Sequence, residues 1–197
     1  ERSCLIKYDS VSKSFNEFAK GPKIPNYPVI DQKRNCIYVS DSFGFNEKGV
    51  GIYKFDLTSG KGGPCSEELF NFANGMCLSP NGDYLYVVES FHPCISRLPI
   101  NSDGTFGKKE IFTENIATVP DGLAFDKEDN LFISCYEPSR IYISDSKGST
   151  RLLIEDKHCT TLAHPTNISL SEDGKTMYTA NLGRWHITEI DISSLYN

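Results

Sequence analysis

The chain has 197 residues, of which 39% are hydrophobic and 23% charged, and its formal net charge is −6. A chain of this length can bury one substantial core but is short for two ordinary domains. No apolar run is long enough to cross a membrane, and the 20 Lys and Arg residues form no basic stripe. We therefore expect neither a membrane nor a nucleic-acid partner.

Strands dominate the chain from its start, and the pattern repeats four times after two initial strands over Cys4–Asp9 and Ser14–Ala19. In each repeat an Asn or Asp opens a first strand, and a polar hairpin turn leads to a second strand rich in Tyr, Val and Ile. A loop and a third strand follow. The predicted second strands are Cys36–Ser40, Tyr84–Glu89, Leu131–Cys135 and Thr176–Ala180.

The rest of each repeat is also strand-like. The predicted third strands are Gly51–Asp56, Cys94–Ile100, Arg140–Ser144 and His186–Ile192. Three repeats have a predicted fourth, outer strand, over Glu67–Phe70, Lys109–Phe112 and Arg151–Glu155. Because no helical period is present, the sequence predicts an all-β fold.

The repeat length identifies the architecture. The intervals from Asn26 to Asn74, Asp121 and Asn167 are 48, 47 and 46 residues. Four-stranded units of about 40 to 50 residues are the blades of β-propellers. We therefore predict one β-propeller domain over 1–197, with the outer half of a blade at 1–20 and successive blades at 21–70, 71–115, 116–157 and 158–197.

The two ends of the chain do not supply a complete ring. The last repeat ends soon after its third strand, and the first twenty residues resemble only the third and fourth strands of a blade. Propellers commonly close by lending an N-terminal strand to the last blade, because an open sheet edge is a liability. We expect a propeller truncated to about four and a half blades. The alternative is a smaller ring in which the N-terminal strands close against the last blade.

The seven cysteines are an odd number, and none forms a C-x-x-C pair or zinc-type spacing. Several lie within apolar strand runs, where free Cys behaves as a small apolar residue. We therefore predict reduced thiols, and these favour a cytoplasmic location.

The evenly spaced Asn and Asp residues form a candidate site. Equivalent positions in a propeller converge on one axis, so Asn26, Asn74, Asp121 and Asn167 would bring four oxygen-bearing side chains together. Such oxygens suit Ca²⁺, Mg²⁺ or Mn²⁺. The alternative interpretation is that these residues only shape turns or cap strands. Loops between second and third strands would lie at the same end, and we expect His92, Tyr136 and Trp185 there as substrate contacts.

Three motifs resemble one known family. Residues 74–82 read NGMCLSPNG and are followed by LYVVES, which is similar to the central signature of the SMP-30/gluconolactonase/luciferin-regenerating-enzyme-like family. Residues 119–126, VPDGLAFD, resemble its next repeat. Residues 165–168, PTNI, and 180–187, ANLGRWHI, fit the closing repeat of its microbial-type members.

This resemblance implies a six-bladed propeller with one divalent cation, often calcium or zinc, near the axis. The family's ligands are an N-terminal Glu, an Asn and an Asp, and the last two match Asn74 and Asp121. A substrate-contacting Asn of the family matches Asn26. Neither Glu1 nor Glu17 has the motif context of the family's Glu. Glu89, at the end of an apolar strand, could substitute for it, but we expect a solvated strand-end role instead.

The sequence therefore predicts a metal-dependent hydrolase of a lactone or related small cyclic ester. Asp121 would be both a cation ligand and the general base toward the attacking water. Ca²⁺ is the first candidate cation, with Zn²⁺, Mg²⁺ or Mn²⁺ as alternatives, and Asn26 and Asn167 would contact the substrate. Two other interpretations stay open: a catalytically impaired propeller that serves as a binding or scaffold protein, and a strictosidine-synthase-like propeller. The oligomeric state is not predicted.

Overall fold

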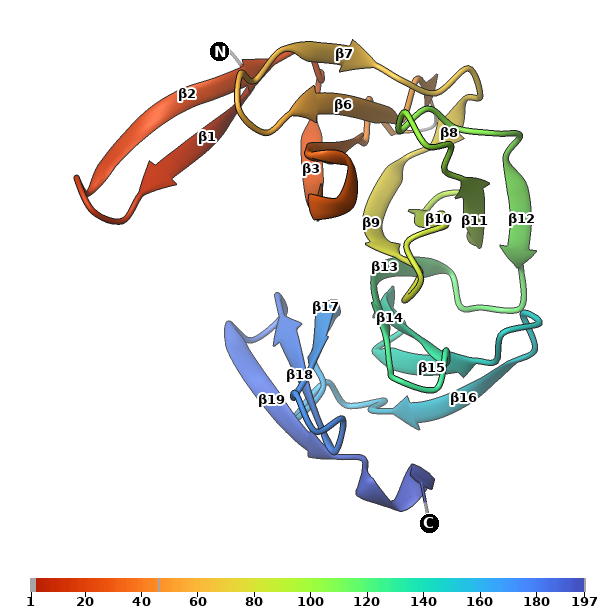
Figure 1. Cartoon of the computed structure of the whole chain (residues 1–197). Coiled ribbons are helices and arrows are strands. Elements are labelled where there is room, and N and C mark those ends of the chain that lie inside the picture. The colour runs from red at the N-terminus through yellow and green to blue at the C-terminus, as the bar shows by residue number, and fades with distance from the viewer. Residues whose placement is uncertain (1–2, 46, 197) are drawn as a thin grey trace.

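A computed structural model describes residues 3–45 and 47–196 of the chain. Its sheets follow one another around an arc, with the N-terminal hairpin projecting from one end (Figure 1). Within these residues strands account for nearly all of the regular structure, and the helical segments are two 3-10 turns, η1 (Gln32–Arg34) and η2 (Ser193–Tyr196). The predicted all-β propeller fold is confirmed.

Each blade is an antiparallel sheet whose strands pair in chain order. The N-terminal hairpin consists of β1 (Cys4–Asp9) and β2 (Ser14–Lys20). The first four-stranded sheet contains β3 (Pro25–Asp31), β4 (Cys36–Asp41), β6 (Ile52–Asp56) and β7 (Gly62–Pro64). A small sheet beside it joins β5 (Lys48–Gly49) to β8 (Phe70–Asn71).

The remaining three sheets repeat this arrangement. The second sheet contains β9 (Ala73–Leu78), β10 (Tyr84–Glu89), β11 (Cys94–Pro99) and β12 (Glu110–Thr113). The third contains β13 (Val119–Phe125), β14 (Leu131–Glu137), β15 (Arg140–Ser144) and β16 (Thr150–Glu155). The fourth contains β17 (Pro165–Leu170), β18 (Thr176–Asn181) and β19 (His186–Asp191).

The outer strand of the first sheet differs from the prediction. Glu67–Phe70 does not form this strand; β7 pairs with β6 instead, and Phe70 belongs to β8. A Cβ on Gly62 would lie within 2.8 Å of the Lys54 carbonyl carbon, so the sheet requires glycine where β7 meets β6. The Gly-Gly-Pro sequence of β7 is typical of turns, and this explains why sequence propensity misses the strand.

The N-terminal hairpin does not close the ring. Strands β1 and β2 pair only with each other, and among the described residues the fourth sheet has three strands. The smaller ring, in which the N-terminal strands would complete the last blade, is therefore wrong. The base of the hairpin packs on the first sheet instead, through a cluster that includes Ala19, Val39 and Phe55.

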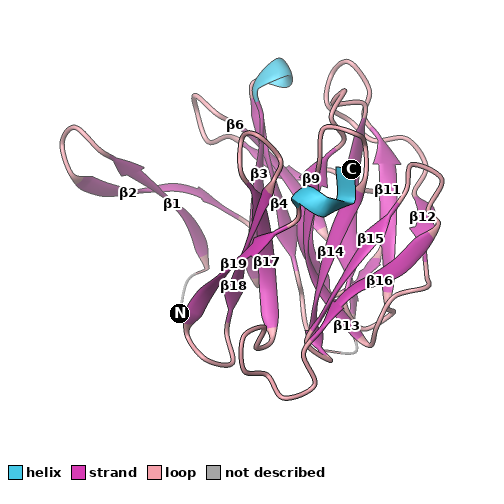
Figure 2. Ribbon diagram, turned by 90° about the horizontal axis from the view of Figure 1, so that it is seen from below, coloured by secondary structure: helices cyan, strands magenta, loops and turns pink. Residues whose placement is uncertain are grey.

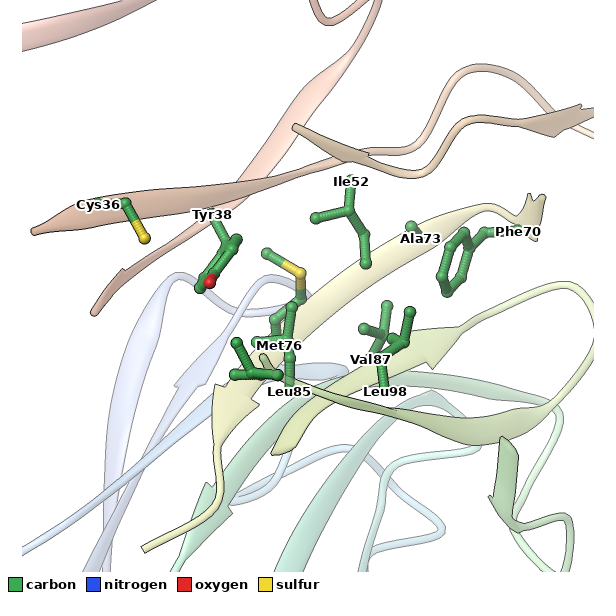
Figure 3. Packing of buried hydrophobic residues seen from close by; sticks show 10 residues of the cluster. Cys36, Tyr38, Ile52, Phe70, Ala73, Met76, Leu85, Val87 and Leu98 are labelled. Carbon is green, nitrogen blue, oxygen red and sulfur yellow. The ribbon is translucent and has the colours of Figure 1, made fainter. Parts of the chain in front are cut away.

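The apolar core lies between neighbouring sheets. One cluster joins the first and second sheets and includes Tyr38, Phe70, Met76 and Leu85 (Figure 3). Equivalent clusters join the second sheet to the third and the third to the fourth. Because each sheet buries a face against its neighbour, the four sheets hold one another in position around the arc.

Two glycines allow the first strands of neighbouring sheets to approach closely. A Cβ on Gly75 would lie 2.9 Å from the Gly122 Cα, and one on Gly122 would lie 2.7 Å from the Asn167 Cα. Any other residue would push β9, β13 and β17 apart. The Asn-Gly and Asp-Gly pairs therefore serve packing at the axis here, because neither glycine has a positive φ.

All seven cysteines are free thiols. Burial raises the pKa of the Cys94 thiol to about 11, and those of Cys65 and Cys135 to about 12. These groups are therefore protonated at neutral pH and pack as apolar side chains. Among the residues that the structure describes, no helix is long and apolar enough to span a membrane.

Candidate functional site

The four predicted ring residues occupy equivalent places near the starts of the first strands. Asn26 lies in β3, Asn74 in β9, Asp121 in β13 and Asn167 in β17. These strands run alongside one another at the inner side of the arc (Figures 1 and 2). The structure thus places the four residues at equivalent positions of neighbouring first strands.

A β-bulge occurs beside each of these residues. In β9, Ala73 pairs with Glu89 and Met76 with Val87, so β9 has one residue more than β10. The strands β3 and β13 have the same irregularity around Asn26 and Asp121, and β17 has it just before Asn167. A bulge twists the strand and redirects the side chain, and bulges are common next to active sites.

Two serines connect this row of residues from blade to blade. Asn26 Nδ2 donates to Ser42 Oγ at 3.0 Å, and Ser42 Oγ donates to the Ala73 carbonyl at 3.0 Å. One blade further on, Asn74 Nδ2 donates to Ser90 Oγ at 3.1 Å, and Ser90 Oγ donates to the Pro120 carbonyl at 2.8 Å. Each serine thus joins one ring residue to the peptide bond that precedes the next.

Asp121 is the carboxylate of this row. Burial raises the pKa of Asp121 to about 7, and a hydrogen bond from the Asn74 side chain partly opposes this increase. Among the described residues, no Lys, Arg or His forms an ion pair with Asp121. A carboxyl group in this state exchanges protons near neutral pH, as a general base must.

The raised pKa of Asp121 predicts that this residue costs stability at neutral pH. As the pH rises above 3.8, the ordinary Asp value, the unfolded chain loses the Asp121 proton while the folded chain keeps it up to about pH 7. The contribution of Asp121 to folding stability is therefore fully present below pH 4, and it is lost as the pH rises toward 7. Three pKa units correspond to about 4 kcal/mol, and partial solvent screening reduces this to about 2 kcal/mol.

Urea unfolding in EDTA tests this prediction with Asp121→Asn, which cannot ionise. The stability of the variant relative to the unchanged protein should increase by about 2 kcal/mol between pH 4.5 and pH 8. A difference that stays constant over this range would show that Asp121 titrates normally.

Asn167 makes a different set of contacts. Its Oδ1 accepts hydrogen bonds from the Ile168 backbone N–H at 2.8 Å and from the Tyr27 hydroxyl at 3.3 Å. Tyr27 belongs to β3, so this hydrogen bond joins the first and last sheets across the arc. The Asn167 amide oxygen is thus engaged within the protein, and its Nδ2 makes no hydrogen bond to the described residues.

Glu89 is neither solvated nor part of this row. It is only 3% exposed, and it accepts hydrogen bonds from the Asn71 N–H at 2.8 Å and the Ser96 hydroxyl at 2.6 Å. Lys109 Nζ lies 3.1 Å from the same carboxylate. The expected solvated strand-end role is wrong, and these contacts identify Glu89 as a buried structural acid that fixes the chain just before Asn74.

The three loop residues predicted as substrate contacts, His92, Tyr136 and Trp185, lie in separate places. The Tyr136 ring packs against His164 in a tilted arrangement with ring centroids 4.7 Å apart, and the Tyr136 carbonyl accepts a hydrogen bond from His164 Nδ1 at 2.8 Å. His92 is exposed, with its Nδ1 3.7 Å from Cys94 Sγ. Trp185 is 88% exposed. Within residues 3–45 and 47–196, no hydrogen bond connects Tyr136, His92 or Trp185 to the Asn and Asp row.

Sequence reasoning missed Ser42, Ser90 and Tyr27 as members of the site. A signal for the serines was present, because Ser42 and Ser90 each follow the ring Asn of their blade by 16 residues and are themselves 48 residues apart. Tyr27 offered no such signal, because the equivalent residues in the next two repeats are glycines.

The donor chemistry of the row fits a hard cation. Asp121 is a desolvated carboxylate with an amide as its neighbour, and nearby positive charge would stabilise its ionised form. Asn74 uses only its Nδ2 in the side-chain hydrogen bonds of the described residues, which leaves Oδ1 as a possible ligand. Neither this row nor any other part of the described chain brings together three or more His, Cys, Asp or Glu residues arranged for a metal. Oxygen donors of this kind favour Ca²⁺ over Zn²⁺.

A comparison with known sequences identifies the family. Residues 46–178, more than half of the chain, match the SMP-30/Gluconolactonase/LRE-like region. The chain belongs to this family. A stretch of 116 residues is 34% identical to the gluconolactonase of Zymomonas mobilis, and this match covers 53% of the chain but only 31% of that enzyme.

Solved structures show the same propeller fold. The chain superposes on a gluconolactonase from Xanthomonas campestris with a TM-score of 0.72 and 16% identity, covering 90% of this chain and 62% of that one. It superposes on the calcium-binding protein regucalcin from Agrobacterium tumefaciens with a TM-score of 0.70 and 18% identity, covering 98% and 65%. At these identities the likeness establishes the fold alone. This member of the SMP-30/gluconolactonase family spans less than two thirds of the length of each of these relatives.

Proposed function

We propose that this chain carries part of the catalytic site of a lactone hydrolase, including Asn74 and Asp121, with Asp121 as the general base. The observation that carries the proposal is the Asp121 carboxyl group in the bulged row beside Asn74, with a pKa raised to about 7. Membership in the SMP-30/gluconolactonase family supports the reaction class.

Asn74 Oδ1 and the Asp121 carboxylate are the groups that would hold a divalent cation, with Ca²⁺ as the first candidate. The calcium-binding regucalcin with the same fold supports this choice. A bound cation supplies electrophilic activation of an ester carbonyl. Two protein oxygens do not fill a Ca²⁺ shell of six to eight ligands, so waters and a third protein ligand would complete it.

The chain's own residues account for the proton transfers. In its ionised form Asp121 accepts a proton from a water molecule as that water attacks the lactone carbonyl carbon. A C–O bond forms, and the ring C–O bond then breaks. Asp121 returns the proton to the departing ring oxygen, which leaves a hydroxy acid. The Asn74 amide, which lowers the pKa of Asp121, would keep the carboxylate oriented for both transfers.

The substrate would be a small cyclic ester. Asn26 is exposed, and its Oδ1 lies free of hydrogen bonds to the described residues, so we assign it a contact with substrate hydroxyl groups. Asn167 Nδ2 could donate to the same molecule from the other side of the arc. Tyr136, packed against His164, would supply an aromatic wall of the binding site. We also propose His92 and Trp185 as substrate contacts from the loops.

The experiment combines calorimetry with an activity assay on the 197-residue chain. We expect Ca²⁺ to bind with one site per chain and glucono-1,5-lactone or a simple γ-lactone to be hydrolysed in its presence. Absence of both results would contradict the proposal and favour a propeller that serves in binding. Hydrolysis that persists unchanged in EDTA would contradict only the role of the cation.

A further inference from the structure

Ser42 and Ser90 are equivalent residues that have the same two partners one blade apart. Both are buried, with exposures of 0% and 1%. Each follows the end of the second strand of its blade and lies between an Asn side chain and a backbone carbonyl that precedes the next ring residue. Because the arrangement occurs twice with matching atoms, an accidental contact does not explain it.

The chemistry of these partners fixes the direction of every hydrogen bond. The Ala73 and Pro120 carbonyls can only accept, so each serine must use its single hydroxyl proton there. The serine oxygen then has only lone pairs left for the Asn side chain. The Asn must therefore turn its Nδ2 toward the serine. This fixes the orientation of the amide, which is otherwise ambiguous because Oδ1 and Nδ2 are similar in shape.

The consequence is that Oδ1 of each Asn points away from the serine. We propose that Ser42 and Ser90 are positioning residues of the site, which hold the Asn26 and Asn74 amides with Oδ1 available to ligands and fix the peptide preceding Asn74 or Asp121. The role of this orientation in ligand binding rests on the proposed function. The hydrogen-bond arrangement itself requires neither a cation nor a substrate.

The third blade has no such serine beside Asp121. The residue that follows Asp121 by 16 positions is Glu137, which is exposed and interacts with His164 at 3.4 Å. Asp121 has two equivalent oxygens and no amide orientation to set, so a serine would have no directional task there. The serine thus occurs in the first two blades, beside Asn26 and Asn74, and not in the third, beside Asp121. The fourth blade has Gly183 at the equivalent position, and there the Asn167 Oδ1 accepts from the Ile168 N–H and the Tyr27 hydroxyl instead.

Side-chain amide exchange measured by NMR in Ser42→Ala and Ser90→Ala tests this role. In Ser90→Ala, exchange of the Asn74 Nδ2 protons should become about tenfold faster, the effect of losing one hydrogen bond, while Asn26 stays unchanged. In Ser42→Ala the two responses should be reversed. Ser144→Ala removes another fully buried hydroxyl, far along β15, and should alter neither Asn.

Calcium titration of the same variants tests whether the orientation serves the site. Ser90→Ala should weaken Ca²⁺ binding by about 10- to 100-fold, as for other residues that orient ligands, and Ser144→Ala should not. The proposal is overturned if Ser90→Ala leaves Asn74 exchange unchanged, or if each alanine variant alters both asparagines equally. It is also overturned if Ca²⁺ affinity survives in Ser90→Ala. If the unchanged chain binds no Ca²⁺, the proposal that Ca²⁺ is the cation is wrong. The role of the serines is then still decided by amide exchange, in which each alanine variant should affect only the Asn of its own blade.

Discussion

Replacing Asp121 by Asn is expected to lower kcat for lactone hydrolysis by about 10³-fold, with KM changed by about threefold or less. The amide has nearly the same shape as the carboxylate, but it cannot take a proton from water. Because Asp121 is also a proposed cation ligand, both proteins are assayed at saturating Ca²⁺. Because the change affects the reaction step more than substrate binding, the loss belongs in kcat.

The pH profile provides an independent check of the same variant. Burial holds the pKa of Asp121 near 7, and a bound cation would lower it. The rate of the unchanged chain should therefore rise with pH to a plateau, with a midpoint at or below pH 7, because the base acts when ionised. Steady-state kinetics from pH 5 to 9 should show this limb, and residual activity of Asp121→Asn should lack it.

Asp129→Asn is the matched control for this experiment. Asp129 is an exposed acid in the same blade with a φ of 63°, a conformation that Asn also adopts readily. The control should retain full activity. Turnover retained by Asp121→Asn, or lost equally in Asp129→Asn, would contradict the assignment of Asp121 as the base.

The sequence predicts the repeated part of this structure well because strand alternation and repeat spacing are local properties. The interval between Asn26 and Asn74 reflects one blade, and a propeller places equivalent residues on one axis whatever their detailed contacts. The same argument explains the failure at β7. Gly62–Pro64 becomes a strand only because β6 offers a free edge, and no local preference indicates such pairing.

The bulges and the hydrogen bond between Tyr27 and Asn167 could not be predicted from the sequence for a related reason. One extra residue beside Asn74 shows only in the register between β9 and β10. Likewise, the hydrogen bond from Tyr27 to Asn167 joins residues 140 positions apart. The serines are the exception, because their 48-residue interval equals that of Asn26 and Asn74 and could have been read directly.

Glu89 has the same structural role as different residue types at equivalent positions in two other sheets. Asp41, Glu89 and Asn181 end the second strands of three sheets, and each accepts a backbone N–H from the segment that leads to the first strand. These hydrogen bonds set where each first strand begins. The acid seen in the sequence as a possible cation ligand is thus part of the support for the ring.

Lys109→Met should therefore destabilise the fold by about 3 kcal/mol at neutral pH, since it leaves the Glu89 carboxylate buried without its cation. Lys109 also donates to the Leu69 carbonyl at 2.6 Å and lies over the Phe70 ring, 4.3 Å from its centroid. Methionine keeps the apolar stem of the side chain and removes only the charge and its hydrogen bonds. Urea unfolding measures the difference, and Lys108→Met, a change at an exposed neighbour, should have an effect near zero.

Calcium distinguishes the structural role of Glu89 from a ligand role in the same experiment. If Glu89 supports the chain before Asn74, Ca²⁺ should leave the stability deficit of Lys109→Met essentially unchanged, because the ion binds at Asn74 and Asp121. If Glu89 is a ligand, removing its lysine would free the carboxylate, and added Ca²⁺ should restore most of the lost stability. The buried contacts with the Asn71 N–H and the Ser96 hydroxyl favour the first outcome, since they already occupy both oxygens of Glu89.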